Sequence, residues 1–202
     1  MTAAAPLMAT GIPTDIKHDK GRYHAYMASG VLIVRTAQEA DELTRKVRSA
    51  ADRLRASISA LEGDGTALLR ALKFDAIGMH PIHGHALNPI EQINQTWTYL
   101  VALAAAHQLL ALHPGAGGLL IAPGAHAAQA LDIMSVEPGV VGAEVFAAVN
   151  PNNNRKLARD LGKLADRTEQ HRYVFFASPR YPETAHRPVL DRHGVQVWSV
   201  HV

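Results

Sequence analysis

Two carboxylates, Asp132 and Glu144, lie on either side of a turn signal, Glu-Pro-Gly at residues 137–139. If this tripeptide is a three-residue loop, Val136 pairs with Val140, and the same register places Asp132 opposite Glu144 on one face of a sheet. Facing carboxylates repel each other by up to about 1 kcal/mol unless a cation lies between them. We therefore predict that they lie within roughly 6 Å of each other and share a hard divalent ion. A different register, with one carboxylate in solvent, is the alternative.

The elements that would position these carboxylates are indicated by a change of sequence period after Pro114. Before it, a helix is predicted with Asn88 as N-cap and Pro89 in its first turn, ending near His113. After it, short apolar runs between glycine, proline and asparagine predict strands, and leucines three and four residues apart predict a helix capped by Asn152. The expected strands cover residues 117–124, 130–139, 140–151, 172–178 and 195–202, and the helix covers 152–168.

The N-terminal part of the chain is expected to add helices to this core. We expect residues 1–21 to form a loose arm, 28–35 a short strand, and 65–73 a short helix. Between them, an amphipathic helix should begin after Thr36, with Glu39 completing a capping box, and stop at Gly63. We expect an α/β fold: a central mixed sheet flanked by helices, with a helix-strand-strand-strand-helix-strand core. The arm and helical segment would span residues 1–87 and the core 88–202, together forming one compact domain.

The order of elements and the two acids together resemble the PD-(D/E)xK superfamily of restriction-endonuclease-like nucleases. The likeness spans residues 88–178. It matches Asp132 in LDIMSV to the family's aspartate, Glu144 in AEVFAAV to its third-strand glutamate, and Glu91 to the acid of its preceding helix. The resemblance implies hydrolysis of DNA phosphodiester bonds with Mg²⁺ or Mn²⁺ held by Asp132, Glu144 and Glu91. It also allows a homodimer, because many such nucleases pair to cut both strands.

The family's lysine is missing from its usual place. Two residues after Glu144 stands Phe146. Some family members supply this lysine from the following helix, and Lys156 is placed to do so and to orient water or phosphate. Arg155 is a neighbouring substitute, and Lys163, two turns further along, is the less favoured candidate. Phe146 favours the alternative that catalysis is lost and the fold serves as a nucleic-acid-binding or protein-interaction module. An unrelated α/β structural protein is a third possibility.

The predicted helix 88–113 raises two further expectations. Its apolar face, with Ile93, Trp97, Leu100 and Leu103 or Ala104, should pack on the sheet while Glu91 points toward the site. Glu91 also has a purely structural explanation, because the third helical position closes a capping box.

Three histidines, His80, His83 and His85, lie within six residues and could share a transition metal. Against a metal site, the surrounding glycine and proline indicate a loop, and no cysteine assists.

Composition restricts the class of protein only broadly. The chain has 202 residues, no cysteine and a net charge of +2, with nine basic against five acidic residues from residue 150 onward. A basic end suits a phosphate-backbone binder, although a solvated surface explains it equally well. Neither secretion nor membrane insertion is indicated, and the cytoplasm is the expected compartment.

Overall fold

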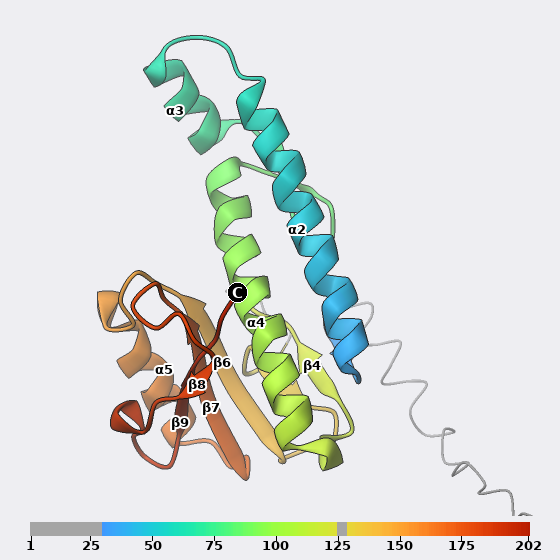
Figure 1. Ribbon diagram of the computed structural model, residues 1–202, viewed down its shortest axis with the longest axis vertical. Coiled ribbons are helices and arrows are strands. Elements are labelled where there is room, and N and C mark those ends of the chain that lie inside the picture. The colour runs from blue at the N-terminus through green and yellow to red at the C-terminus, as the bar shows by residue number, and fades with distance from the viewer. Residues whose placement is uncertain (1–29, 125–128) are drawn as a thin grey trace, which may run out of the picture.

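The computed structural model describes residues 30–124 and 129–202, and over these residues the chain is an α/β protein (Figure 1). A seven-stranded mixed sheet is flanked by four α-helices, in agreement with the predicted fold class. The helices are α2 (Ala37–Ser59), α3 (Gly65–Phe74), α4 (Pro89–Leu112) and α5 (Lys156–Ala165). The strands of the sheet are β1 (Leu32–Val34), β4 (Leu119–Ile121), β5 (Ile133–Ser135), β6 (Val141–Ala147), β7 (His171–Ala177), β8 (Ala185–His186) and β9 (Gln196–Ser199), in the order β1-β4-β5-β6-β7-β9-β8.

The centre of the sheet has the predicted order of elements. Strands β4, β5 and β6 are antiparallel neighbours, and β7 then pairs parallel to β6 after the crossover through α5. Ile133 pairs with Ala143, which is the register expected from the Glu-Pro-Gly turn. Because side chains alternate along a strand, this register directs Asp132 and Glu144 to the same face.

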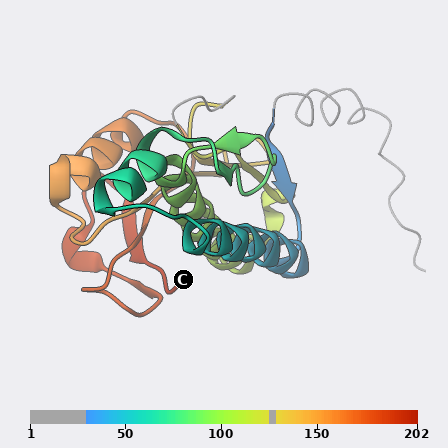
Figure 2. The same ribbon diagram turned by 90° about the horizontal axis from the view of Figure 1, so that it is seen from above.

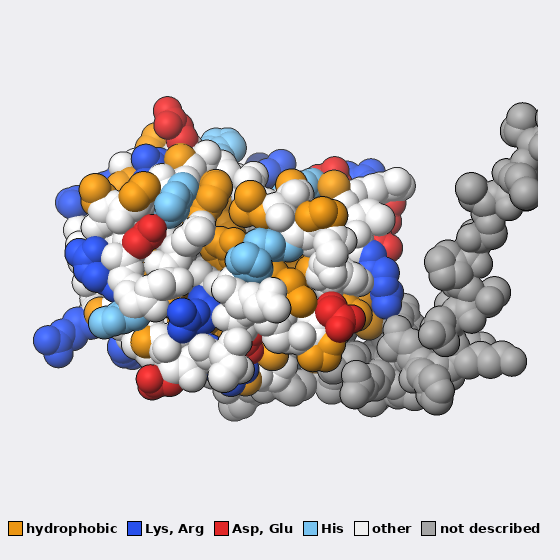
Figure 3. All heavy atoms as spheres, turned by 90° about the horizontal axis from the view of Figure 1, so that it is seen from below, with side chains coloured by type: hydrophobic (Ala, Val, Ile, Leu, Met, Phe, Trp, Pro, Cys, Tyr) orange, Lys and Arg blue, Asp and Glu red, His pale blue; other side chains and the backbone are white. Residues whose placement is uncertain are grey.

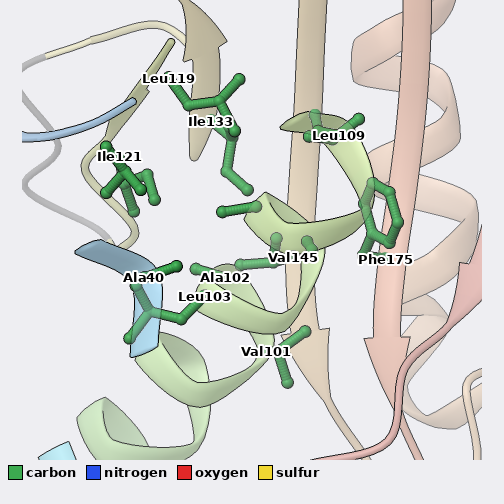
Figure 4. Close-up of a cluster of buried hydrophobic side chains, with 14 of the residues drawn as sticks. Ala40, Val101, Ala102, Leu103, Leu109, Leu119, Ile121, Ile133, Val145 and Phe175 are labelled. Carbon is green, nitrogen blue, oxygen red and sulfur yellow. The ribbon is translucent and has the colours of Figure 1, made fainter. Parts of the chain in front are cut away.

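The two faces of the sheet have separate cores. Val145 and Phe175 point toward α4, in a cluster that also contains Leu103 and Leu109 of that helix (Figure 4). The next residues along the same two strands, Phe146 and Phe176, belong to a second cluster with Leu157, Leu161 and Leu164 of α5. Helix α4 therefore covers one face of the sheet and α5 the other.

Helix α4 is enclosed because α2 lies along its outer side (Figure 2). The prediction that Ile93 and Trp97 pack on the sheet was wrong: these side chains are 44% and 47% exposed. The N-terminal half of α4 extends beyond the sheet (Figure 1), and there Gln92 donates to the Ala50 carbonyl of α2. That bond turns the Gln92 face inward and leaves the next residue, Ile93, outside. Leu103, further along, is fully buried as predicted.

Local signals located the starts of two helices well and of one helix poorly. Thr36 and Glu39 form the predicted capping box at α2, and the Asn88 side chain caps α4. Asn152, in contrast, makes no side-chain cap bond, so the cap predicted for α5 was wrong. A 3₁₀ turn occupies residues 153–155, in which Asn154 and Arg155 have φ values of 53° and 55°, and regular helix begins only afterwards.

Two short strands, β2 (Gly78–Met79) and β3 (Ala86–Leu87), form a separate hairpin around the histidine loop. The described residues contain no helix of the length and apolar character needed to cross a membrane.

Candidate acidic and basic site

A cavity of about 680 Å³ opens between α4 and α5 beside the C-terminal half of β6. Asn94, Trp97 and Thr98 of α4 form one wall. The charged residues of the lining are Asp132, Glu144, Lys156, Arg159, Asp160 and Lys163. Three acids and three bases therefore line a space large enough for a phosphate group and its waters.

Asp132 and Glu144 are adjacent in this cavity. The Asp132 backbone N–H donates to Glu144 Oε1 at 3.4 Å, and the backbone N–H of Val145 donates to Asp132 Oδ2 at 2.9 Å. Gly124 donates its N–H to the other oxygen, Oδ1, at 3.3 Å. Each strand thus anchors the acid of its neighbour, which fixes both carboxylates on the face predicted from the register.

Burial and charge shift the titration of Asp132. Desolvation is the main cause that raises the pKa of this carboxyl to about 6, and the negative charge of Glu144 adds to it. The hydrogen bonds from Val145 and Gly124 act in the opposite direction. Asp132 therefore changes charge close to neutral pH, which is common for groups in functional sites.

Helix α5 supplies the cations. Lys163 Nζ donates to Glu144 Oε1 at 2.7 Å, whereas Lys156 Nζ donates to Asp160 Oδ1 at 2.7 Å. Lys156, Asp160 and Lys163 follow one another at spacings of four and three residues, so they share one side of α5. Lys156 was predicted in preference to Lys163. Both lysines line the cavity, but Lys163 is the one bound to Glu144.

Asp160 was not among the site residues predicted from the sequence. Its side chain is buried, and burial raises the pKa of its carboxyl. Within the described part of the chain, its Oδ2 atom is buried and has no hydrogen-bond partner. Lys-x-x-x-Asp-x-x-Lys along α5 was the signal available, because this spacing places all three charges on one helical face.

Glu91 does not belong to the cavity lining. It is exposed in the first turn of α4, where its backbone N–H donates to the Asn88 side chain. Asn94, one turn further along the helix, is the nearest α4 residue to reach the cavity wall.

Phe146 occupies the position where the resemblance expects a lysine. Its ring is 5% exposed and lies 5.8 Å from the ring of Phe176, within the core between the sheet and α5. The Lys156 ammonium lies 5.9 Å from the Phe146 ring centroid. An aromatic core position is thus filled by β6, and the positive charge reaches the same region from α5.

The histidine loop is a separate group. The ring of His80 lies 4.6 Å from that of His83 and 4.8 Å from that of His85. His80 Nδ1 accepts the backbone N–H groups of Ile82 and His83, so this nitrogen already has partners. Burial, followed by the charges of the neighbouring histidines, lowers the pKa of His80 to about 4, so its ring is neutral near pH 7.

Neither the surface charge nor comparison with known proteins indicates what binds in the cavity. Lys, Arg, Asp and Glu are interspersed around the end of the molecule shown in Figure 3, without a dominant sign. Residues 30–124 and 129–202 contain no set of three or more His, Cys, Asp or Glu side chains placed to hold a metal ion.

Comparison with family models, curated proteins and solved structures finds no match to this chain. Its function therefore has to be inferred from the site itself.

Proposed function

We propose that this protein is a Mg²⁺-dependent nuclease that hydrolyses DNA phosphodiester bonds, with a site of the PD-(D/E)xK type. The observation that carries the proposal is the pairing of Asp132 with Glu144 on neighbouring strands, in an open cavity that also contains lysines. The helix, three antiparallel strands, helix and parallel strand around it have the order that such a site requires. As part of the same proposal, the protein acts in the cytoplasm.

The two carboxylates suit magnesium better than a metal that requires three or more protein ligands. Mg²⁺ retains several waters and binds through one or two carboxylates plus substrate phosphate oxygens, so a third protein ligand is not required. Asp132 and Glu144 would hold the ion, which supplies an activated water and neutralises charge on the scissile phosphate when it is bound. Because the pKa of Asp132 is about 6, this carboxylate is mostly ionised, and able to bind, above pH 7.

The bases of α5 would hold the phosphate. Lys163 contacts Glu144 directly, so its ammonium is placed to bind a phosphate oxygen next to that carboxylate. Lys156 is the alternative proposed from the sequence, and it would have to exchange Asp160 for the substrate. Glu91 would take part only through a water-mediated contact, because it is exposed and outside the lining.

A binding module without catalysis is the second candidate, and two observations favour it. Lys163 already neutralises Glu144, so the buried carboxylate does not require a metal for charge balance. Phe146 fills a core position on β6, at the place where the resemblance expects a lysine. In this alternative, the cations of the cavity would bind nucleic acid without cutting it.

Cleavage of supercoiled plasmid and of labelled single-stranded oligonucleotide with Mg²⁺ or Mn²⁺ tests the proposal. Asp132→Asn and Glu144→Gln should each reduce the rate at least about 100-fold, because each removes a charged group required for the transition state. Glu137→Gln is the matched control, since Glu137 is an exposed acid in the turn between β5 and β6. Cleavage that survives both site substitutions would contradict the proposal, and wild type that binds DNA but never cuts would favour the binding module.

A pair of lysine variants assigns the cation. Lys163→Met and Lys156→Met change the same charge on the same helix, seven residues apart. If Lys163 holds the phosphate, Lys163→Met should lose cleavage while Lys156→Met retains most of it. The reverse result would restore Lys156 to the role predicted from the sequence.

A further inference from the structure

A second hollow adjoins the charged cavity. This apolar groove, of about 550 Å³, is lined mainly by Trp97, Ala147, Val149, Tyr181, Pro182 and Val200. Trp97 and Ala147 line both the groove and the charged cavity, so the two spaces adjoin. The Trp97 ring is 47% exposed at their junction.

We propose that this groove receives one unpaired nucleobase of the DNA strand whose phosphate lies in the charged cavity, with the base stacked on Trp97. The inference rests on the proposed nuclease function and adds a substrate class, namely single-stranded DNA or frayed strand ends. A nucleotide combines an anionic phosphate with a flat, largely apolar base. Adjoining charged and apolar hollows match these two parts.

The groove is suited to a base face rather than to base edges. Ser178 Oγ donates to the Val149 carbonyl, and the His201 ring contacts the Pro182 carbonyl at 3.0 Å. These polar side chains of the lining are therefore bonded within the protein. Stacking on an aromatic ring is available to every base, so the groove should show little sequence preference.

The same geometry disfavours an intact duplex. In a duplex each base face is covered by the neighbouring base pairs, and only edges are offered in the grooves. Stacking on Trp97 would require the base to leave the DNA double helix, which costs free energy for unstacking and unpairing that a single strand largely avoids. Single strands should therefore bind more tightly than duplexes of the same length.

The Trp97 rim can be tested by binding alone. Fluorescence anisotropy in EDTA, with a labelled short oligothymidylate, measures affinity without cleavage. Trp97→Leu keeps an apolar side chain but removes the ring, and should weaken binding about 5- to 100-fold, the equivalent of one stacked base. Trp97→Phe should restore most of the affinity. Ile93→Ala is the control, because Ile93 is a similarly exposed residue one turn earlier on α4 and lines neither hollow.

The same oligonucleotide backbone with abasic sites separates stacking from phosphate contacts. Its affinity should be unchanged by Trp97→Leu if the ring binds a base. Equal weakening of thymidylate and abasic binding, or no weakening of either, would overturn the groove assignment, as would wild-type binding of duplex as tight as that of single strand. Because cleavage is not measured, loss of the nuclease proposal leaves this test intact. Conversely, if Trp97→Leu leaves cleavage of the single-stranded oligonucleotide unchanged, the nuclease is retained and the groove is rejected.

Discussion

The two faces of the sheet are built from the same strands but differ in what they bury. The α4 face is a continuous apolar cluster that α2 covers from outside, with Leu103, Leu109 and Phe175 fully buried. The α5 face has a smaller apolar cluster, beside which Glu144 and Asp160 are 4% exposed.

Burying a charged group costs free energy unless it is paired and hydrogen-bonded. Glu144 and Asp160 have lysine partners, but the Oδ2 atom of Asp160 remains without a partner among the described residues. An apolar face would be more stable. The difference therefore indicates that the α4 face maintains the fold, while the α5 face gives up stability for a charged site.

The largest expected effect compares Phe175 with Phe176, neighbours on β7 that point to opposite faces and are both 0% exposed. Phe175→Ala should reduce the free energy of unfolding by about 3–5 kcal/mol. Phe176→Ala should cost less, because the smaller cluster beside the cavity can relax toward open space. Urea unfolding followed by far-UV circular dichroism measures both. Equal losses would show that the two faces are equally tightly packed.

The second prediction concerns the ion pair of the α5 face. Lys163→Met leaves Glu144 buried without its cation, and should destabilise the protein by about 1–3 kcal/mol at pH 7.5. Adding Glu144→Gln should recover most of this loss, because the unpaired charge is then absent. Urea unfolding of both single variants and the double variant gives the coupling between the two sites. No recovery in the double variant would mean that Lys163 acts through its stem and not through its charge.

The main features of the core followed from short-range signals in the sequence. Thr36 and Asn88 cap their helices as expected, and the Glu-Pro-Gly turn set the register that places Asp132 beside Glu144. Caps and tight turns involve residues three to five positions apart, so neighbouring sequence is sufficient to specify them.

Features that depend on tertiary packing were mispredicted or missed. The buried side of α4 was predicted to include Trp97, but Trp97 is 47% exposed, and the buried side there carries Gln92, which donates to the Ala50 carbonyl of α2. The start of α5 depends on two residues with positive φ, Asn154 and Arg155, which no sequence rule singled out. Asp160 lines the cavity because of the way α5 packs against β6, which is a tertiary contact.

The third prediction uses the pH dependence of Asp132. Its pKa in the folded protein, about 6, lies above the ordinary value of 3.8, so its contribution to stability is fully present below pH 4 and is lost as pH rises through 6. Asp132→Asn should therefore match the wild type in stability below pH 4 and exceed it by about 1–2 kcal/mol above pH 7, after allowance for partial exposure.

Thermal unfolding from pH 3.5 to pH 8 measures this difference, with Glu137→Gln as the exposed control. A stability gain that does not change with pH would show that burial of the charge is not its cause. Added Mg²⁺ should stabilise the wild type and not Asp132→Asn, if the carboxylate holds the ion.

The smallest expected effect concerns Phe146, which belongs to the apolar cluster of the α5 face and also lines the charged cavity. Phe146→Leu keeps an apolar side chain at this position and should cost less than about 1.5 kcal/mol, because the cavity on one side accommodates the change in shape.

The substitution also removes the ring that lies 5.9 Å from the Lys156 ammonium. A cation–π contact at a partly exposed site contributes about 0.5–1 kcal/mol, so Phe146→Leu should cost less by about that amount when it is introduced into the Lys156→Met variant. Urea unfolding of the two single variants and the double variant measures that coupling. A cost as large as that of Phe176→Ala would place Phe146 wholly in the core, and the boundary between the stabilising cluster and the charged site would then lie at Glu144.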